Sequence, residues 1–168
     1  MPLRQNQKKW SLLSKKSSNM KDQFPELFLE NQLCFPLYAT SRLITKLYTP
    51  FLKELDITYP QYLVLLALWQ NDKLSVKSIG EALFLESNTL TPLLKRLEQK
   101  NIIQRNRSSQ DERAVIVSLT SKGSELKYLA KEIPHKIVAS FQEADMNETE
   151  IIGFQKNLFQ LLKILKHR

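Results

Sequence analysis

The fold is decided by the stretch SNTLTPLLKRLEQKNIIQRNRSSQDER, which runs from Ser87 to Arg113. Its first half repeats leucine at the i, i+3, i+4 and i+7 spacing of a helix with one apolar face, at Leu90, Leu93, Leu94 and Leu97. Beyond Asn101, a helix-stopping residue, two runs rich in β-branched residues, 102–105 and 114–119, flank the polar turn residues 106–111. The stretch therefore predicts a helix that is followed by a β-hairpin.

The helix face opposite the leucines is polar. It carries side chains that can donate hydrogen bonds to phosphates or base edges, namely Asn88, Thr89, Thr91, Lys95, Arg96 and Gln99. Ser87 is suited to cap the helix N-terminus. From Lys95 to Arg113, six basic residues stand against three acidic ones, a local net charge of +3. This surface favours nucleic-acid binding, although a solvated basic surface is also common in other proteins.

A shorter segment upstream, 74–84, predicts a helix that ends just before the polar one. The resulting order is helix, turn, helix, strand, wing, strand, which is the order of a winged helix-turn-helix. We therefore predict a mainly α fold with a small β-wing, in which residues 57–119 form the winged helix-turn-helix. A second helix is expected from about Pro60 to Gln70, since proline fits a first helical turn.

The composition is that of one globular domain, with 168 residues, 42% hydrophobic and 25% charged. The net charge of +8 is unevenly spread, because residues 1–22 hold six basic residues against one acidic residue. The rest of the chain keeps only +3, so an argument for DNA binding depends on where the charges lie. We expect residues 1–24 to be a disordered basic extension and residues 25–168 to form the domain.

Several classes of site are disfavoured by the residue inventory. The longest apolar run, Tyr62–Trp69, is much shorter than the roughly 20 residues of a membrane span, which predicts a soluble, cytoplasmic protein. One cysteine cannot form an intrachain disulfide, and the two isolated histidines, His135 and His167, lack zinc-ligand spacing. We therefore expect no metal and no other cofactor.

Long apolar helices are predicted at both ends of the domain, at about 27–55 and 120–166. The second is expected to bend near Pro134 and to restart at a capping box formed by Asn147–Glu150. A small winged domain offers little core to cover such helices, so we predict that they form the interface of a homodimer. Two recognition helices would then face a pseudo-palindromic operator on double-stranded DNA.

The single cysteine, Cys34, lies among apolar residues, which taken alone favours a small buried side chain over a reactive thiol. Reactivity requires a thiolate, and tyrosine hydroxyls can stabilise one by donating hydrogen bonds. Tyr48 shares the predicted helix face with Cys34 but lies 14 residues away, about 21 Å along a helix. If Tyr48 serves Cys34, it comes from the partner chain; otherwise the tyrosines are interface packing.

Four motifs together resemble the MarR family, and within it the one-cysteine branch that senses organic hydroperoxides. They are ENQLCF at 30–35, ITYPQY at 57–62, TLTPLLKR at 89–96 and DER at 111–113. The resemblance covers about residues 27–166. It implies a winged helix-turn-helix with N- and C-terminal dimerisation helices, and a regulator that binds DNA rather than an enzyme.

The resemblance also implies roles for individual residues. Cys34 would be the redox-sensing thiol, with Tyr38 lining its pocket and Tyr48 and Tyr59 of the other subunit holding the thiolate. The predicted DNA-binding residues come from the resemblance and from the basic residues nearby, and are Ser87, Asn88, Thr89, Thr91, Pro92, Lys95, Arg96, Arg105, Arg107, Asp111 and Arg113. Arg113 would enter the minor groove, oriented by Asp111.

The predicted function is a repressor that releases its operator when an organic hydroperoxide oxidises Cys34. The sulfenic acid would need a small thiol, a backbone nitrogen or further oxidation, because the chain has no second cysteine. An alternative is a MarR-type regulator released by a small aromatic ligand, with Cys34 structural. A thiol peroxidase is disfavoured by the missing resolving cysteine, and an architectural DNA-binding protein would show little sequence preference.

Two features depart from the family pattern. Pro36 stands two residues after Cys34 and is expected to kink the first helix or delay its start. Asn88 stands where similar regulators have a glycine at the start of the recognition helix, which is expected to alter base preference.

Overall fold

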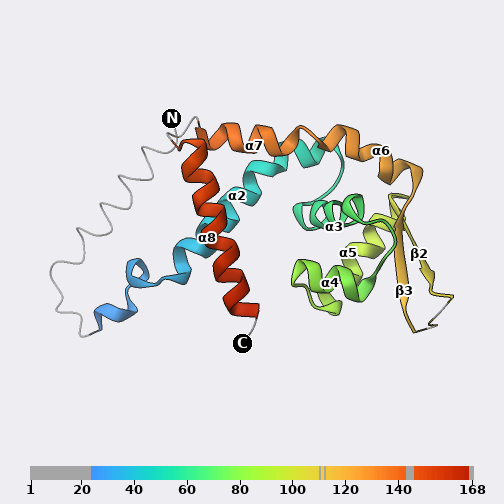
Figure 1. Ribbon diagram of the computed structural model, residues 1–168, viewed down its shortest axis with the longest axis horizontal. Coiled ribbons are helices and arrows are strands. Elements are labelled where there is room, and N and C mark those ends of the chain that lie inside the picture. The colour runs from blue at the N-terminus through green and yellow to red at the C-terminus, as the bar shows by residue number, and fades with distance from the viewer. Residues whose placement is uncertain (1–23, 110, 112, 143–145, 167–168) are drawn as a thin grey trace. The chain divides into compact units, whose positions relative to one another are not determined.

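The structure is a computed structural model that describes residues 24–109, 111, 113–142 and 146–166, so almost all of the predicted extension at 1–24 lies outside the described residues. The elements follow in the order η1 Pro25–Leu27, η2 Leu29–Asn31, α2 Cys34–Glu54, α3 Tyr59–Gln70, β1 Leu74–Ser75, α4 Val76–Leu83, α5 Ser87–Gln99, β2 Ile103–Arg107, β3 Val115–Leu119, α6 Ser121–Ala130, α7 Ile133–Gln142 and α8 Glu148–Lys166 (Figure 1). Helices and one three-stranded sheet confirm the predicted mainly α fold. The chain divides into two compact units, up to Leu43 and from Ile44.

In the first unit, the helix predicted from residue 27 begins later, at Cys34. Two short 3-10 turns precede it, and the Asn31 side chain closes the first by donating from Nδ2 to the Pro25 carbonyl at 2.7 Å. The physical reason is Pro36. A proline within the first turn loses no helical hydrogen bond, whereas a helix running through it from residue 27 would lose one and meet a clash.

The second unit is built on one buried apolar cluster. The predicted stripe on α5 is confirmed, because Leu90, Leu94 and Leu97 are each 0% exposed and Leu93 is half-buried. Other fully buried members of the cluster come from α2, α3, α4, the sheet and the turn before β2, and include Leu52, Val64, Leu65, Ile79, Ile102, Ile103 and Val117. This burial fixes which face of α5 is left for solvent.

Caps set where the helices of this unit begin and end. The Thr58 N–H donates to Gln61 Oε1 at 2.9 Å and starts α3, and the Ser75 Oγ accepts from the Ser78 N–H at 2.9 Å and starts α4. Asn101 ends α5 in the left-handed conformation, with φ of 55°, as its position in the sequence predicted.

The sheet is antiparallel with strand order β1-β3-β2. β2 and β3 form the predicted wing, in the register Ile103↔Leu119 to Arg107↔Val115. β1 was not predicted, because two residues are too short to show an alternating pattern. It places the start of α4 beside β3, since Leu74 pairs with Val117.

The C-terminal helices follow the predicted pattern with one correction. The part of the predicted 120–166 helix that precedes the capping box is two helices, α6 and α7, since Pro134 occupies the first turn of α7 instead of bending one continuous helix. The predicted capping box of α8 is confirmed by reciprocal bonds between Asn147 and Glu150 at 2.8 and 3.0 Å. No helix in the described ranges is both long and apolar enough to cross a membrane.

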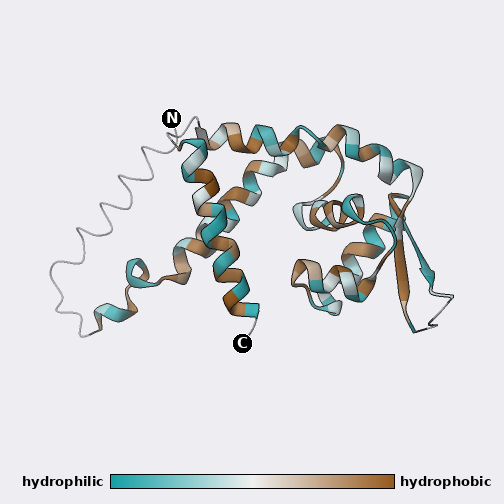
Figure 2. Cartoon of the chain, viewed as in Figure 1, coloured by the Kyte–Doolittle hydropathy of each residue, from teal (hydrophilic) through white to brown (hydrophobic). Residues whose placement is uncertain are grey.

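α8 carries apolar side chains that the single chain leaves exposed, and Figure 2 shows brown residues along its length. They are Ile152, Phe154, Leu158, Phe159, Leu162, Ile164 and Leu165. In water, so continuous an apolar surface is stable only when something covers it.

Two glycines provide a matched test of the packing. A Cβ built on Gly123 in α6 would lie 2.1 Å from the Ile102 carbonyl oxygen, whereas one on Gly153 in α8 meets nothing within 4 Å. Gly123→Ala should therefore lower the free energy of unfolding by about 3 kcal/mol. Gly153→Ala should raise it by up to about 1 kcal/mol, because alanine is the better helix former. Urea unfolding of both variants measures this, and equal effects would contradict the packing of α6 against Ile102.

Candidate functional site

The face of α5 opposite the buried leucines is exposed along its length. Ser87, Asn88, Thr89, Thr91, Pro92, Lys95 and Arg96 are all exposed. The N-cap is Glu86 instead of Ser87, which is the first helical residue. The Thr91 hydroxyl donates back to the Ser87 carbonyl at 2.7 Å, a bond made within the helix. The predicted recognition surface is thus presented as one continuous polar face.

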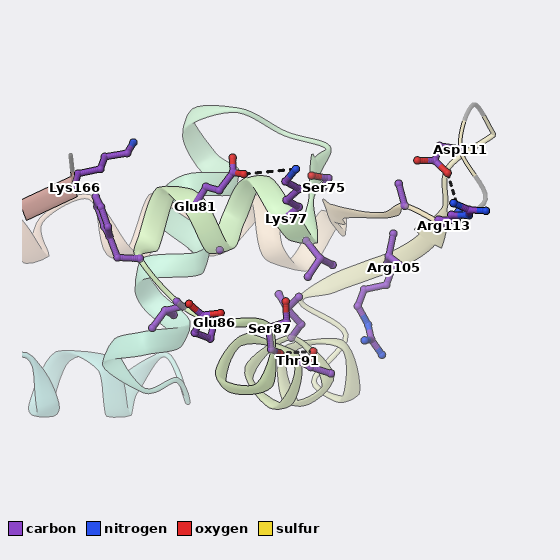
Figure 3. A pocket seen from close by; sticks show the side chains of 17 residues that line it. Ser75, Lys77, Glu81, Glu86, Ser87, Thr91, Arg105, Asp111, Arg113 and Lys166 are labelled. Carbon is purple, nitrogen blue, oxygen red and sulfur yellow. Dashed lines mark hydrogen bonds and ion pairs between the residues drawn. The ribbon is translucent and has the colours of Figure 1, made fainter. Parts of the chain in front are cut away.

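The wing carries the predicted Arg107, Asp111 and Arg113, all exposed. The Asp111 carboxylate accepts from the Arg113 backbone N–H at 3.0 Å, while the Asp111 N–H donates to Ser108 Oγ at 3.3 Å. Asp111 therefore shapes the backbone that carries Arg113, instead of pairing with its guanidinium (Figure 3). The orienting role of Asp111 stays a prediction, and these bonds would exert it through the main chain.

Arg105 differs from the other predicted cations because it has an internal partner. It is half-buried, and it donates to Glu98 Oε2 from Nε at 3.0 Å and from a terminal nitrogen at 2.5 Å. These bonds from Arg105 hold the pKa of Glu98 below its ordinary value. The pair joins the last turn of α5 to β2. Glu98 therefore largely compensates the positive charge of Arg105. The DNA contact of Arg105 stays a prediction.

A groove of about 1200 Å³ lies between α4, α5 and the wing, and it brings together residues from all three (Figure 3). Ser87, Thr91 and Arg113 were predicted from the sequence, whereas Lys77, in the first turn of α4, was missed. The Ser75 cap could have indicated that Lys77 lies in the first turn of a helix, but only the unexpected β1 places that turn beside the wing. The groove also contains carboxylates, and Glu81 lies 4.0 Å from Lys77.

Cys34 is the first residue of α2 and is exposed, so the burial that its apolar neighbours favoured is not found in the single chain. Tyr38 lies one turn later on the same helix face and is 60% exposed. Its hydroxyl accepts from Arg42 at 3.1 Å, and the Arg42 guanidinium lies 5.7 Å from the ring centre. Arg42, at i+8 from the cysteine, was not predicted from the sequence.

In the second unit, Tyr48 from α2 and Tyr59 from α3 are brought together, with ring centres 4.8 Å apart. Tyr62 joins them at 5.9 Å from Tyr48 and 6.4 Å from Tyr59, and we call these three residues the tyrosine cluster. Tyr48 and Tyr59, which were both predicted as site residues, are therefore in contact with each other. Tyr62 was not predicted as a site residue, although its i+3 spacing from Tyr59 places both on one helix face.

Burial is the main cause that raises the pKa of Tyr48 to about 12, and charge on Tyr59 and Tyr62 contributes to the same rise. Burial also raises the pKa of Tyr59 and of Tyr62. The three phenols are consequently protonated at neutral pH and are hydrogen-bond donors. Such donors suit an anionic acceptor, for example a thiolate.

Known proteins resemble the chain over most of its length. The model of the transcriptional regulator SarA/Rot family matches residues 46–129. The organic hydroperoxide resistance transcriptional regulator of Bacillus subtilis is 47% identical over 149 residues, 89% of this chain and 99% of that protein. MarR from E. coli shares the fold at 21% identity, with a TM-score of 0.63, over 78% of this chain and 96% of MarR.

The structure also resembles AbfR, a protein of Staphylococcus epidermidis. Reduced AbfR bound to DNA is 40% identical, with a TM-score of 0.67, over 83% of this chain and 93% of AbfR. An overoxidised AbfR bound to DNA and a disulfide form of AbfR match as well, with TM-scores of 0.63 and 0.54.

The pKa of Tyr48 can be tested by following tyrosinate absorbance with pH. We expect Tyr48→Phe to remove a component that titrates near pH 12 in the native protein. Because this folded pKa exceeds the ordinary value of 10.0, the contribution to stability is complete below pH 10.0 and is lost as the pH rises through about 12. Loss of a component near pH 10 instead would contradict the burial of this phenol.

Proposed function

The chain belongs to the MarR family of transcriptional regulators, and we propose that it is a repressor that leaves its operator when an organic hydroperoxide oxidises Cys34. Its relatives are regulators of transcription, not enzymes. The observation that carries the DNA-binding part of the proposal is the division of α5 into a face of leucines that are 0% exposed and an opposite face whose predicted DNA-binding residues are all exposed.

On DNA, the exposed face of α5 would enter the major groove, where Asn88 and Arg96 can reach base edges. The wing would follow the backbone, with Arg113 directed to the minor groove and Lys77 close to a phosphate. DNA-bound AbfR supports this assignment by similarity. A regulator of this kind acts where the DNA is, so we also propose a cytoplasmic location.

A homodimer would cover the apolar face of α8 and present two recognition helices to a pseudo-palindromic operator. It would also complete the sensor. Cys34 and Tyr48 are 14 residues apart, about 21 Å along one helix, so the thiol of one subunit would meet the tyrosine cluster of its partner. The exposure of Cys34 in the single chain fits a site that a second copy completes.

The thiolate sulfur would attack one peroxide oxygen. The O–O bond breaks, the sulfur gains a hydroxyl group and is oxidised by two electrons, and the alkoxide leaves and takes up a proton as the alcohol. Since overoxidised AbfR has been crystallised on DNA, added oxygen is compatible with DNA binding in that protein. We therefore place release here at a bulkier state, a mixed disulfide that a low-molecular-weight thiol forms by displacing water.

Fluorescence anisotropy on operator DNA tests the function. Cumene hydroperoxide with a small thiol should weaken DNA binding by the parent protein at least about ten-fold, and Cys34→Ser should be unaffected. Release of Cys34→Ser as readily as the parent would reject the redox mechanism and favour release by a small aromatic ligand. Scrambled competitor DNA is the control for sequence preference.

The salt dependence of binding distinguishes Arg107 from Arg105, which both lie on β2. Arg107→Gln should reduce the slope of log K against log salt by about one per subunit, because a phosphate contact releases a counterion. Arg105→Gln should leave the slope nearly unchanged, because Glu98 already compensates that charge. Equal reductions would mean that Arg105 leaves Glu98 on binding DNA.

A further inference from the structure

We propose that Tyr62 is a positioning residue that holds the Tyr48 and Tyr59 hydroxyls in the arrangement that receives the partner's thiolate. The inference rests on the proposed function. It adds to the sensor a residue that does not itself reach the thiol, because Tyr62 is only 2% exposed.

The need for such a residue follows from where the two donors come from. Tyr48 belongs to α2, whereas Tyr59 is the first residue of α3. No backbone hydrogen bond within one helix fixes their relative position, so side-chain packing must do so. Tyr62 is in ring contact with both, at 5.9 and 6.4 Å, and it is more deeply buried than either. The buried Tyr62 ring therefore packs against both phenol rings and supports their positions.

Tyr62 is itself held in place. Trp69, two turns further along α3, meets its ring edge-on, with centres 6.1 Å apart and planes at 70°. The Trp69 Nε1–H donates to the Gly123 carbonyl at 2.9 Å, and this bond anchors the indole to the first turn of α6. Movement of the Tyr62 ring would thus disturb a packed tryptophan with a satisfied hydrogen bond.

The electrostatics agree with this packing. Burial is the main cause that raises the pKa of Tyr48 and of Tyr62, and charge on a neighbouring phenol adds to it in both cases, from Tyr59 and Tyr62 on Tyr48 and from Tyr59 on Tyr62. Burial alone raises the pKa of Tyr59. The partner's thiolate would then meet two protonated hydroxyls, those of Tyr48 and Tyr59, whose directions are fixed by their packing against Tyr62.

The decisive measurement is the rate of Cys34 oxidation by cumene hydroperoxide, followed by mass spectrometry of the intact protein with its sulfenic acid trapped. Tyr62→Leu, which removes the ring, should slow oxidation at least about ten-fold, because misplaced groups cost rate steeply. Tyr62→Phe, which keeps the ring, should restore the rate to within about two-fold of the parent protein. An unchanged rate in Tyr62→Leu would overturn the proposal.

A matched control separates positioning from general loss of stability. Leu97→Ala also truncates a fully buried side chain, but on α5. It should lower the melting temperature while leaving the oxidation rate within about two-fold of the parent. If Leu97→Ala slows oxidation as much as Tyr62→Leu does, the effect of Tyr62 is only structural and the proposal is wrong.

If Tyr62→Leu does not fold, Tyr62→Met takes its place in the rate measurement, because it also removes the ring but loses less volume. An unchanged oxidation rate in Tyr62→Met would likewise overturn the proposal. Failure of the proposed function has a different signature. In that case Cys34 of the parent protein does not control DNA binding at all, whatever residue occupies position 62.

Discussion

The burial of one face of α5 is the constraint on which the rest of the structure depends. Leu90, Leu94 and Leu97 have no exposed surface, so the helix cannot rotate about its axis without bringing apolar side chains into water. Its polar face is consequently held in one direction. The Glu98–Arg105 pair extends this order to the wing, because it joins the last turn of the helix to the first wing strand.

Features carried by local patterns could be predicted from the sequence. The leucine spacing predicted α5 and its buried face, and Asn101 predicted where that helix ends. Asn147 with Glu150 predicted the start of α8. These succeed because periodicity and capping act over a few neighbouring residues. The family membership was also predictable, since motifs around Cys34 and within α5 occur together.

Features that depend on contacts between distant residues could not be predicted. β1 exists only because Leu74 meets Val117, and the charge of Arg105 is compensated only because a wing strand passes Glu98. The Glu86 cap of α5 reflects competition at helix ends, where patterns are weakest, whereas the late start of α2 was expected from Pro36. Tyr62 was missed for a similar reason, since its aromatic partners lie on two helices.

The uncovered apolar face of α8 has a consequence for the cell. If a second copy covers that face, the folded population rises with the concentration of the chain itself. Newly made chains at low abundance would expose several leucines and phenylalanines, which chaperones and proteases recognise. Quality control would then remove unassembled copies and set a lower limit to the amount of regulator that persists, independently of any oxidant.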